Sequence, residues 1–380
     1  MYIQGQGKIT VSRKKQSLGG KRYNPLDVGY KALIASLNVL QKSGYITQVI
    51  ASHTKDAIAT IKPTDKLIQW FTDTEWSNDR VTKTVGTYVT LREIRKQNNH
   101  SVYADFKDTK YSKWLSERIR EYDQLLNSCK ISLVGVDEVV FNKFTVQREF
   151  VKYESTSQNM EFSFGGKISA PWEDMPSKFR KHITINGEAT VELSVDTSDL
   201  DAMYKVIAGS PHSQSDPYHT MVDGKAILKH IVKNFSLFMQ GSKSPKAAAH
   251  SVLNHYKRSA LEVKNPKEID VNQYEEYVEL KRLIKPMNIA QAFLGKHPKI
   301  ADYYNRGKAY GDFIACWESD IAFEVLMELT KKDIPCLRIC NSFVIPAQYE
   351  ELAKNMIDSA SYVDRRSISK DLPTKKDDDT

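Results

Sequence analysis

The most constraining stretch of the sequence is Ile183–Ala208, in which a turn, a strand and a helix follow one another. Gly187 lies in the polar turn and tolerates positive φ. β-branched and apolar residues predict a strand over 190–195, and a helix is expected over 200–208. The strand delivers Asp196 to its far end. A carboxylate at this point can hold a metal ion over a cleft or serve as a plain helix cap, and the pattern alone favours the cap.

The bulk composition indicates a soluble globular protein with a polyanionic partner. The chain has 380 residues, is 41% hydrophobic and 27% charged, and carries a net charge of +8. This length predicts two or three domains, and the basic balance favours nucleic acid. No apolar run approaches the ~20 residues needed to cross a membrane, so we expect no membrane partner. The four cysteines follow no metal-binding spacing and the N-terminus lacks the apolar core of a secretion signal, so a cytoplasmic location is expected.

The sequence of residues 1–75 predicts a basic arm followed by a winged-helix domain. A helix opened by Pro25 and stopped by Gly44 precedes a two-stranded hairpin, 45–50 and 57–61, and a further helix over 65–71. This order is typical of a winged helix that binds DNA, or of a small interaction domain of the same shape. The expected DNA contacts are basic, and the arm residues can equally form a solvated tail. They are Arg13, Lys14, Lys15, Lys21, Arg22, Lys31 and Lys55.

Residues 76–155 are expected to form a helical linker or thumb-like region, with its main helix over 108–128. The following run, 162–180, contains Lys167 and Arg180, which can reach phosphate or remain solvated. Trp172 in the same run can belong to the core or stack on a base, and the core is favoured.

In the C-terminal half, the sequence pattern predicts mostly helices and one β-hairpin. Lys229 and Lys233 lie four residues apart on a helix expected over 225–239, where they can bind a triphosphate or form a wet surface. A strand over 334–340, a turn at Asn341-Ser342 and a returning strand over 343–345 are expected, with Cys336 and Cys340 packed inside. Residues 363–380 are expected to be disordered.

These pieces, in this order, are similar to the DNA polymerase I and phage-type single-subunit RNA polymerase superfamily. The closer resemblance is to plasmid- and phage-borne proteins with a polymerase-like palm. It covers roughly residues 165–346 and rests on short motifs, which are GGK…W…P…R at 165–180, INGEATVEL at 185–193, DTSDLDAMY at 196–204, SDPY at 215–218, HPKIADYY at 297–304, SDIA at 319–322 and ICNSFVIP at 339–346. The resemblance implies an α+β fold in which an antiparallel palm sheet, backed by helices, carries a small helical fingers-like insertion within 156–362.

The family mechanism needs two divalent ions, Mg²⁺ or Mn²⁺, held about 4 Å apart by two carboxylates. The resemblance assigns Asp196 as the first carboxylate. The second belongs to a His-Asp-Ser hairpin turn, where this sequence has Cys340-Asn341-Ser342. Asn341 is neutral and a poorer ligand for a hard cation.

Other features of the family are also altered. The nucleotide-facing helix has Lys229 where the family has arginine, and its terminal Tyr-Gly is replaced by Gln240-Gly241. Nucleoside triphosphates are therefore a candidate ligand rather than an established one. Substitute carboxylates for the missing metal ligand are available nearby in the sequence, and they are Asp199, Asp201, Glu318 and Asp320.

Three hypotheses follow from these residues. The chain is an active DNA or RNA polymerase or primase that uses a substitute carboxylate, or a palm that kept binding and lost chemistry. Alternatively it is a replication or regulatory factor in which the winged helix binds DNA and the palm is scaffold. Asn341 favours the second hypothesis: a nucleic-acid-binding pseudoenzyme of a mobile element or phage.

Overall fold

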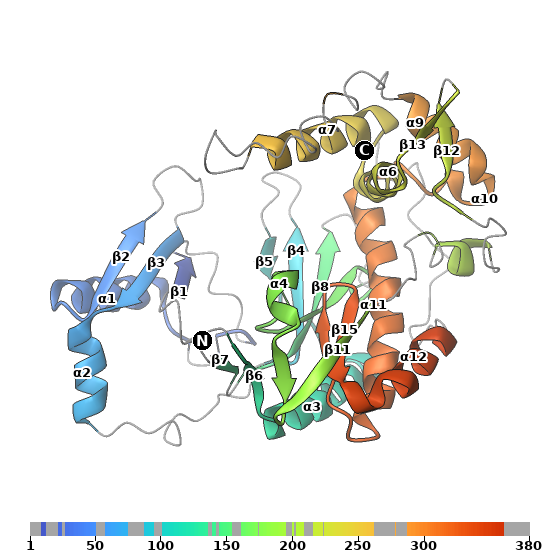
Figure 1. The fold of residues 1–380 in the computed structure, drawn as a ribbon. Helices are drawn as coiled ribbons and strands as arrows, with labels where there is room; N and C mark the ends of the chain where they lie inside the picture. The colour runs from blue at the N-terminus through green and yellow to red at the C-terminus, as the bar shows by residue number, and fades with distance from the viewer. Residues whose placement is uncertain are drawn as a thin grey trace. The chain divides into compact units, whose positions relative to one another are not determined.

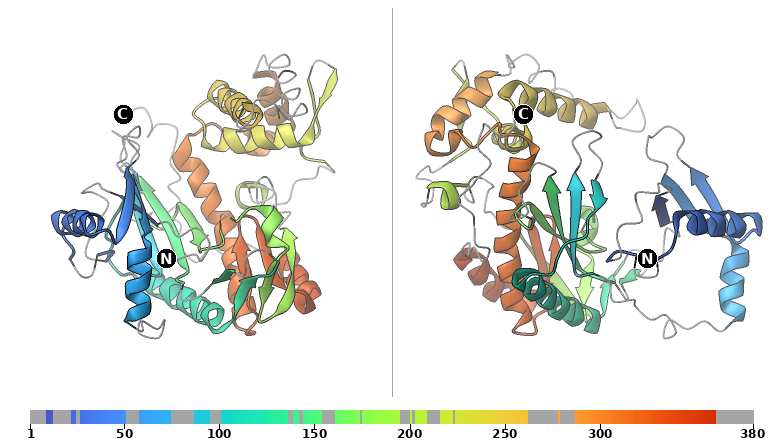
Figure 2. Two further views of the ribbon diagram at one scale, coloured as in Figure 1. Left: turned by 60° about the vertical axis from the view of Figure 1, so that its left-hand side comes forward. Right: turned by 180° about the vertical axis from the view of Figure 1, so that it is seen from behind.

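A computed structural model describes residues 9–12, 22–24, 27–50, 58–74, 87–94, 101–135, 139–141, 144–153, 161–173, 175–194, 200, 203–208, 216–222, 224–261, 278 and 287–360. The described chain is a mixed α+β protein with several antiparallel sheets, as the sequence predicts (Figures 1 and 2). It divides into two compact units. The first comprises Met1–Val195 and Ile321–Ser361, and the second comprises Asp196–Asp320 and Tyr362–Thr380.

The N-terminal part of the first unit is a three-stranded antiparallel sheet with two helices. The strand order is β1-β3-β2. Leu37, Ile46 and Ile61 form its small core. The elements are β1 (Ile9–Ser12), α1 (Tyr30–Lys42), β2 (Ile46–Ile50), β3 (Ile58–Pro63) and α2 (Asp65–Asp73).

Two expectations for this part are wrong. β1 lies inside the segment that the sequence predicts to be an arm. A strand of four residues has too weak a local pattern to be predicted, and it is defined by its pairing with β3, for example Ile9 with Ile61. α1 begins at Tyr30 and not near Pro25. The side chain of Asn24 accepts a hydrogen bond from the N–H of Val28 at 3.0 Å and donates to its carbonyl at 3.1 Å, which holds a turn before the helix.

A second sheet occupies the region expected to be a helical linker. Its order is β5-β4-β8-β9, in which β4 and β8 are parallel. The helix lies close to its expected place, and the region expected to be a helical linker also contains strands of this sheet. The elements are β4 (Val89–Ile94), β5 (Ser101–Tyr103), α3 (Lys110–Ser128), β8 (Gln147–Tyr153) and β9 (Gly165–Ser169).

The third sheet is antiparallel throughout and contains the strands that the polymerase resemblance rests on. Its order is β14-β15-β11-β10-β6-β7. Asn186 and Gly187, both at positive φ, form the tight turn between β10 and β11. The strands are β6 (Ile131–Leu133), β7 (Val139–Phe141), β10 (Ile183–Ile185), β11 (Glu188–Ser194), β14 (Leu337–Ile339) and β15 (Ser342–Pro346).

Short helices flank this sheet. α4 (Ser177–Arg180) precedes β10, and the 3-10 turn η5 (Ala347–Tyr349) follows β15. α12 (Glu350–Ser359) packs on β11 (Figure 1). Trp172 is fully buried against Phe141 and Phe144, so its predicted place in the core is confirmed.

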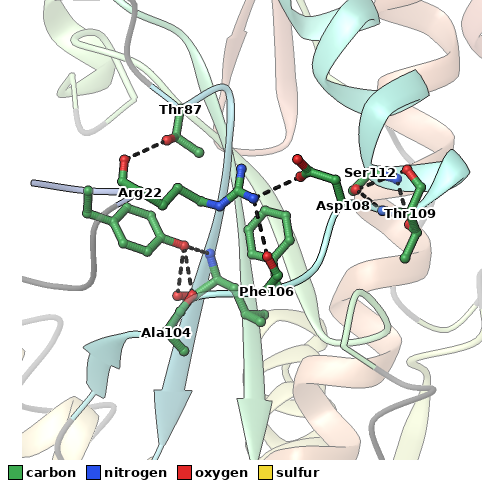
Figure 3. A network of polar contacts seen from close by, with 9 residues as sticks. Arg22, Thr87, Ala104, Phe106, Asp108, Thr109 and Ser112 are labelled. Carbon is green, nitrogen blue, oxygen red and sulfur yellow. Dashed lines mark hydrogen bonds and ion pairs between the residues drawn. The ribbon is translucent and has the colours of Figure 1, made fainter. Parts of the chain in front are cut away.

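Residues 22–23 are anchored to the second sheet (Figure 3). The guanidinium of Arg22 forms an ion pair with Asp108 at 2.8 Å and lies 4.0 Å from the centre of the Phe106 ring. The hydroxyl of Tyr23 donates to the carbonyl of Ala104 and accepts from the N–H of Leu91 at 2.9 Å. Arg22 therefore has a structural role that the sequence did not predict.

The second unit is mainly helical. Lys225 begins a strand and not the expected helix, because Gly224 at φ +77° closes a tight hairpin turn. The elements are η4 (a π-helix, Tyr204–Ala208), β12 (Thr220–Val222), β13 (Lys225–Ile227), α6 (Lys229–Gly241), α7 (Pro245–Leu261), α9 (Met287–Lys296), α10 (Pro298–Ala301) and α11 (Lys308–Thr330). α11 continues across the boundary into the first unit. Throughout the described part, no helix combines the length and apolar character needed to cross a bilayer.

Tyr122 joins α3 to the segment immediately before β14, and this contact can be tested. Its buried hydroxyl donates to the carbonyl of Cys336 at 2.5 Å, and burial raises the pKa of Tyr122 well above its ordinary value. Tyr122→Phe leaves that carbonyl without the donor. We expect the free energy of unfolding to fall by about 1–3 kcal/mol, measured by urea denaturation.

Tyr349→Phe is the matched control, because Tyr349 is only partly buried and its hydroxyl has no hydrogen bond within the described residues. It should change stability by less than about 0.5 kcal/mol. Equal losses in the two variants would contradict the assignment.

Candidate functional site

The candidate site lies at the turn of the β14–β15 hairpin. Ile339 pairs with Ser342, so the turn consists of Cys340 and Asn341, one residue earlier than the sequence predicts. All five residues of β15 are buried, so both faces of this strand are covered, and its pairing with β14 and β11 sets the register. Asn341 is consequently held at an exposed tip.

The end of β11 lies beside this turn. β11 and β15 are antiparallel, and Ser194 pairs with Ser342. The two hydroxyl oxygens are 3.5 Å apart. Asp196 follows two residues after Ser194 and lies outside the described residues, so its predicted role as a metal ligand stays a prediction.

Arg180 brings a positive charge to the same turn. Its Nε donates to the carbonyl of Met175 at 2.9 Å, and its Nη1 pairs with Glu192 at 2.7 Å. Its Nη2 lies 3.8 Å from the Sγ of Cys340. The Arg180 side chain is only 15% exposed, so these contacts hold it in place. We name Arg180, Ser194, Cys340, Asn341 and Ser342 the hairpin-end site.

Cys340 departs from its expected place in the core. It is exposed in the turn with φ +50°, whereas Cys336 is buried as expected. Its Sγ donates to the carbonyl of Glu173 at 3.6 Å. Two-residue connections between antiparallel strands require positive φ in the turn, a conformation that residues other than glycine seldom adopt.

The described carboxylates around the hairpin-end site are already paired. Glu192 is neutralised by Arg180, and Glu173 forms an ion pair with Lys167 at 2.8 Å. Among the described residues, the remaining polar groups at the tip that could bind a metal ion are the amide of Asn341, the hydroxyls of Ser194 and Ser342, and the thiol of Cys340. Lys167 and Arg180, expected to bind phosphate, therefore each have an acidic partner in this chain.

The substitute carboxylates divide into two groups. Asp199 and Asp201 lie outside the described residues. Glu318 and Asp320 are part of α11, partly buried, and each interacts with other groups of the protein. Within the described ranges, no three histidine, cysteine or acidic side chains gather as a metal site.

In the second unit, Lys229 and Lys233 are exposed on the same side of α6. Lys229 lies 3.7 Å from Asp216. Desolvation alone would raise the pKa of the Asp216 carboxyl. The N–H of Tyr218 and the cations of Lys229 and Lys296 outweigh it and lower that pKa below its ordinary value.

Gln240, which the polymerase resemblance aligns with a tyrosine, is buried at the end of α6. Its Nε2 lies 3.8 Å from the Sδ of Met203. A Cβ on Gly311 of α11 would come within 3.3 Å of the Gln240 backbone, so α6 and α11 approach closely here. Gln240 is therefore packed inside the second unit, although the helical repeat places it on the same side of α6 as the exposed Lys229 and Lys233.

The predicted DNA contacts are placed only in part. Lys31 is exposed on α1, and Arg22 is ion-paired to Asp108. The remaining predicted contacts lie outside the described residues, and they are Arg13, Lys14, Lys15, Lys21 and Lys55. The hydroxyl pair of Ser194 and Ser342 has no local sequence signal, because strand pairing joins residues that are far apart in the chain.

The fold and the site define a mixed α+β protein with an antiparallel sheet whose hairpin tip is polar and lacks an unpaired carboxylate among the described residues. The chain matches no protein-family model, no curated protein and no solved structure.

The Asp216–Lys229 pair gives a direct test of the charge at the start of α6. Because Lys229 helps lower the pKa of Asp216, Lys229→Gln should raise that pKa toward its ordinary value. Carbon-detected NMR titration of the side-chain carboxyl measures the change. Lys225→Gln is the control, since it removes an exposed lysine that is not among the groups lowering this pKa. An unchanged pKa in Lys229→Gln would contradict the pairing.

Proposed function

We propose that the protein is a nucleic-acid-binding, polymerase-like protein of a mobile element or phage, with nucleotidyl transfer that is weak or absent. The observation that carries the proposal is Asn341. Asn341 lies at the exposed tip of the β14–β15 hairpin, and β15 pairs with β11. The polymerases that the sequence resembles have a carboxylate at the position of Asn341.

The charges around the tip support the loss of chemistry. Mg²⁺ prefers several oxygen ligands that include carboxylates. The described donors at the hairpin-end site are an amide, hydroxyls and a thiol, and the carboxylates of Glu173 and Glu192 are ion-paired. These donors do not fit a pair of divalent cations, and a missing negative charge beside such ions weakens both metal binding and transition-state stabilisation.

The N-terminal sheet and helices support docking on DNA. α1 leads directly into the β2–β3 hairpin, and the sheet order β1-β3-β2 is compatible with a winged helix. The exposed residues of α1 include Lys31, Ala35 and Lys42, which are basic or small. A helix with such a side can enter a major groove, and its cations can contact phosphates.

Primer extension tests the chemical half of the proposal. The unmodified protein, supplied with Mg²⁺ or Mn²⁺, a primed template and triphosphates, should extend the primer weakly or not at all. Asn341→Asp should increase synthesis, because it restores a carboxylate at the hairpin tip. The readout is product length on a denaturing gel.

Asn341→Ala is the control, since it alters the tip without adding charge and should remain silent. Robust synthesis by the unmodified protein that disappears in Asp196→Ala would overturn the inactive assignment. If Asn341→Asp stays silent while DNA binding persists, the winged-helix replication or regulatory factor becomes the better description.

A further inference from the structure

The α6–α7 pair is free of acidic residues in the sequence. Between Asp223 and Glu262 the chain contains six lysines and one arginine and no aspartate or glutamate. The two helices pack together, with the amide of Asn234 donating to the hydroxyl of Tyr256 at 2.8 Å. Residues 224–261 therefore carry charge of one sign only.

One side of α7 concentrates this charge. Lys246, His250 and Lys257 are all exposed, and at 3.6 residues per turn they lie within about 40° of one another around the helix. We name these three residues the α7 stripe. The opposite side of the helix is buried and includes Ala248, Ala249, Val252 and Tyr256. Neither lysine of the stripe forms an ion pair with an acidic residue of the described chain.

α3 provides the internal comparison for an ordinary solvated helix. Its exposed surface mixes both signs of charge, and Arg118 and Arg120 pair with Glu121 and Glu117 on the same helix. Interspersed charges of this kind are typical of helix surfaces that only face water. The α7 stripe lacks such pairs, so it leaves its positive charge available to an external anion.

We infer that the α7 stripe binds the sugar–phosphate backbone of a nucleic acid. The inference rests on nucleic acid being the partner proposed above, and it adds a contact outside the predicted site residues. Lys246 and Lys257 are eleven residues apart, which corresponds to about 16 Å along the helix. This length spans about five phosphates of one strand.

The composition of the stripe also indicates how it binds. Two of its three side chains are lysines, whose ammonium groups are suited to phosphate oxygens, so we assign the stripe to backbone contacts. A membrane-surface helix would need an exposed apolar side next to its cations. The apolar side of α7 is buried in the second unit, which favours nucleic acid over a lipid surface.

The test compares two double variants of the full-length protein that remove the same charge. Lys246→Gln/Lys257→Gln alters the α7 stripe. Lys110→Gln/Lys113→Gln alters two exposed lysines of α3. Fluorescence anisotropy measures the affinity for a labelled single strand of about 20 nucleotides and, separately, for its duplex. The salt concentration is varied from about 50 to about 200 mM, a range over which phosphate contacts make the affinity fall steeply.

The α7 variant should bind about tenfold more weakly at low salt than the α3 variant. Its salt slope should fall by about 1.4 on the single strand or about 1.8 on the duplex, from the loss of two phosphate contacts. A selective loss on either probe supports the inference and identifies the form of nucleic acid that the stripe binds.

Equal affinities of the two variants on both probes would overturn the inference while leaving the proposed function in place. A loss confined to anionic phosphatidylserine vesicles would overturn it as well. If the wild-type protein binds neither oligonucleotide, the proposed function itself fails. Matching thermal unfolding curves for the two variants exclude a folding defect as the cause.

Discussion

The pairing of β11 with β15 is the interaction on which the site depends. Ser194 pairs with Ser342, which places the end of β11 at the tip of the β14–β15 hairpin. β15 lies between β14 and β11 in the sheet, and its residues Phe343, Val344 and Ile345 are all in the core. This register determines which residues form the exposed turn, and they are Cys340 and Asn341.

Charge decides what such a tip can do. A polymerase-like palm needs carboxylates that are free to bind cations, and here Glu173 and Glu192 are each paired with a basic side chain. Basic groups without such pairing occur elsewhere, above all at Lys246 and Lys257 of α7. This distribution of charge is the basis for proposing that the protein binds an anionic polymer and does not catalyse its synthesis.

Elements with a strong local pattern are well predicted from the sequence. The turn at Asn186-Gly187 and the helix α3 lie where the sequence predicts them. β1 could not be predicted, because four residues carry too weak a pattern until they pair with β3. The strand at Lys225 was missed for a similar reason, since a short hairpin beside a helix looks like the first turn of that helix.

The site is less predictable than the fold. Asn341 is singled out in the sequence only by the polymerase resemblance, which expects a carboxylate at that position. The partners of Arg22 and Arg180 could not be identified from the sequence, since Asp108 is 86 residues from Arg22 and Cys340 is 160 residues from Arg180. Such contacts are created by tertiary packing, and no local pattern encodes them.

The central claim is that the hairpin tip does not hold a pair of divalent cations, and Mn²⁺ binding followed by electron paramagnetic resonance tests it most directly. Titrating the full-length protein with Mn²⁺ and recording the signal of the free ion gives the number of tightly bound ions per chain. The account predicts no tightly bound pair in the unmodified protein and tighter binding in Asn341→Asp. Two tightly bound Mn²⁺ ions per unmodified chain, lost in Asp196→Ala, would contradict it.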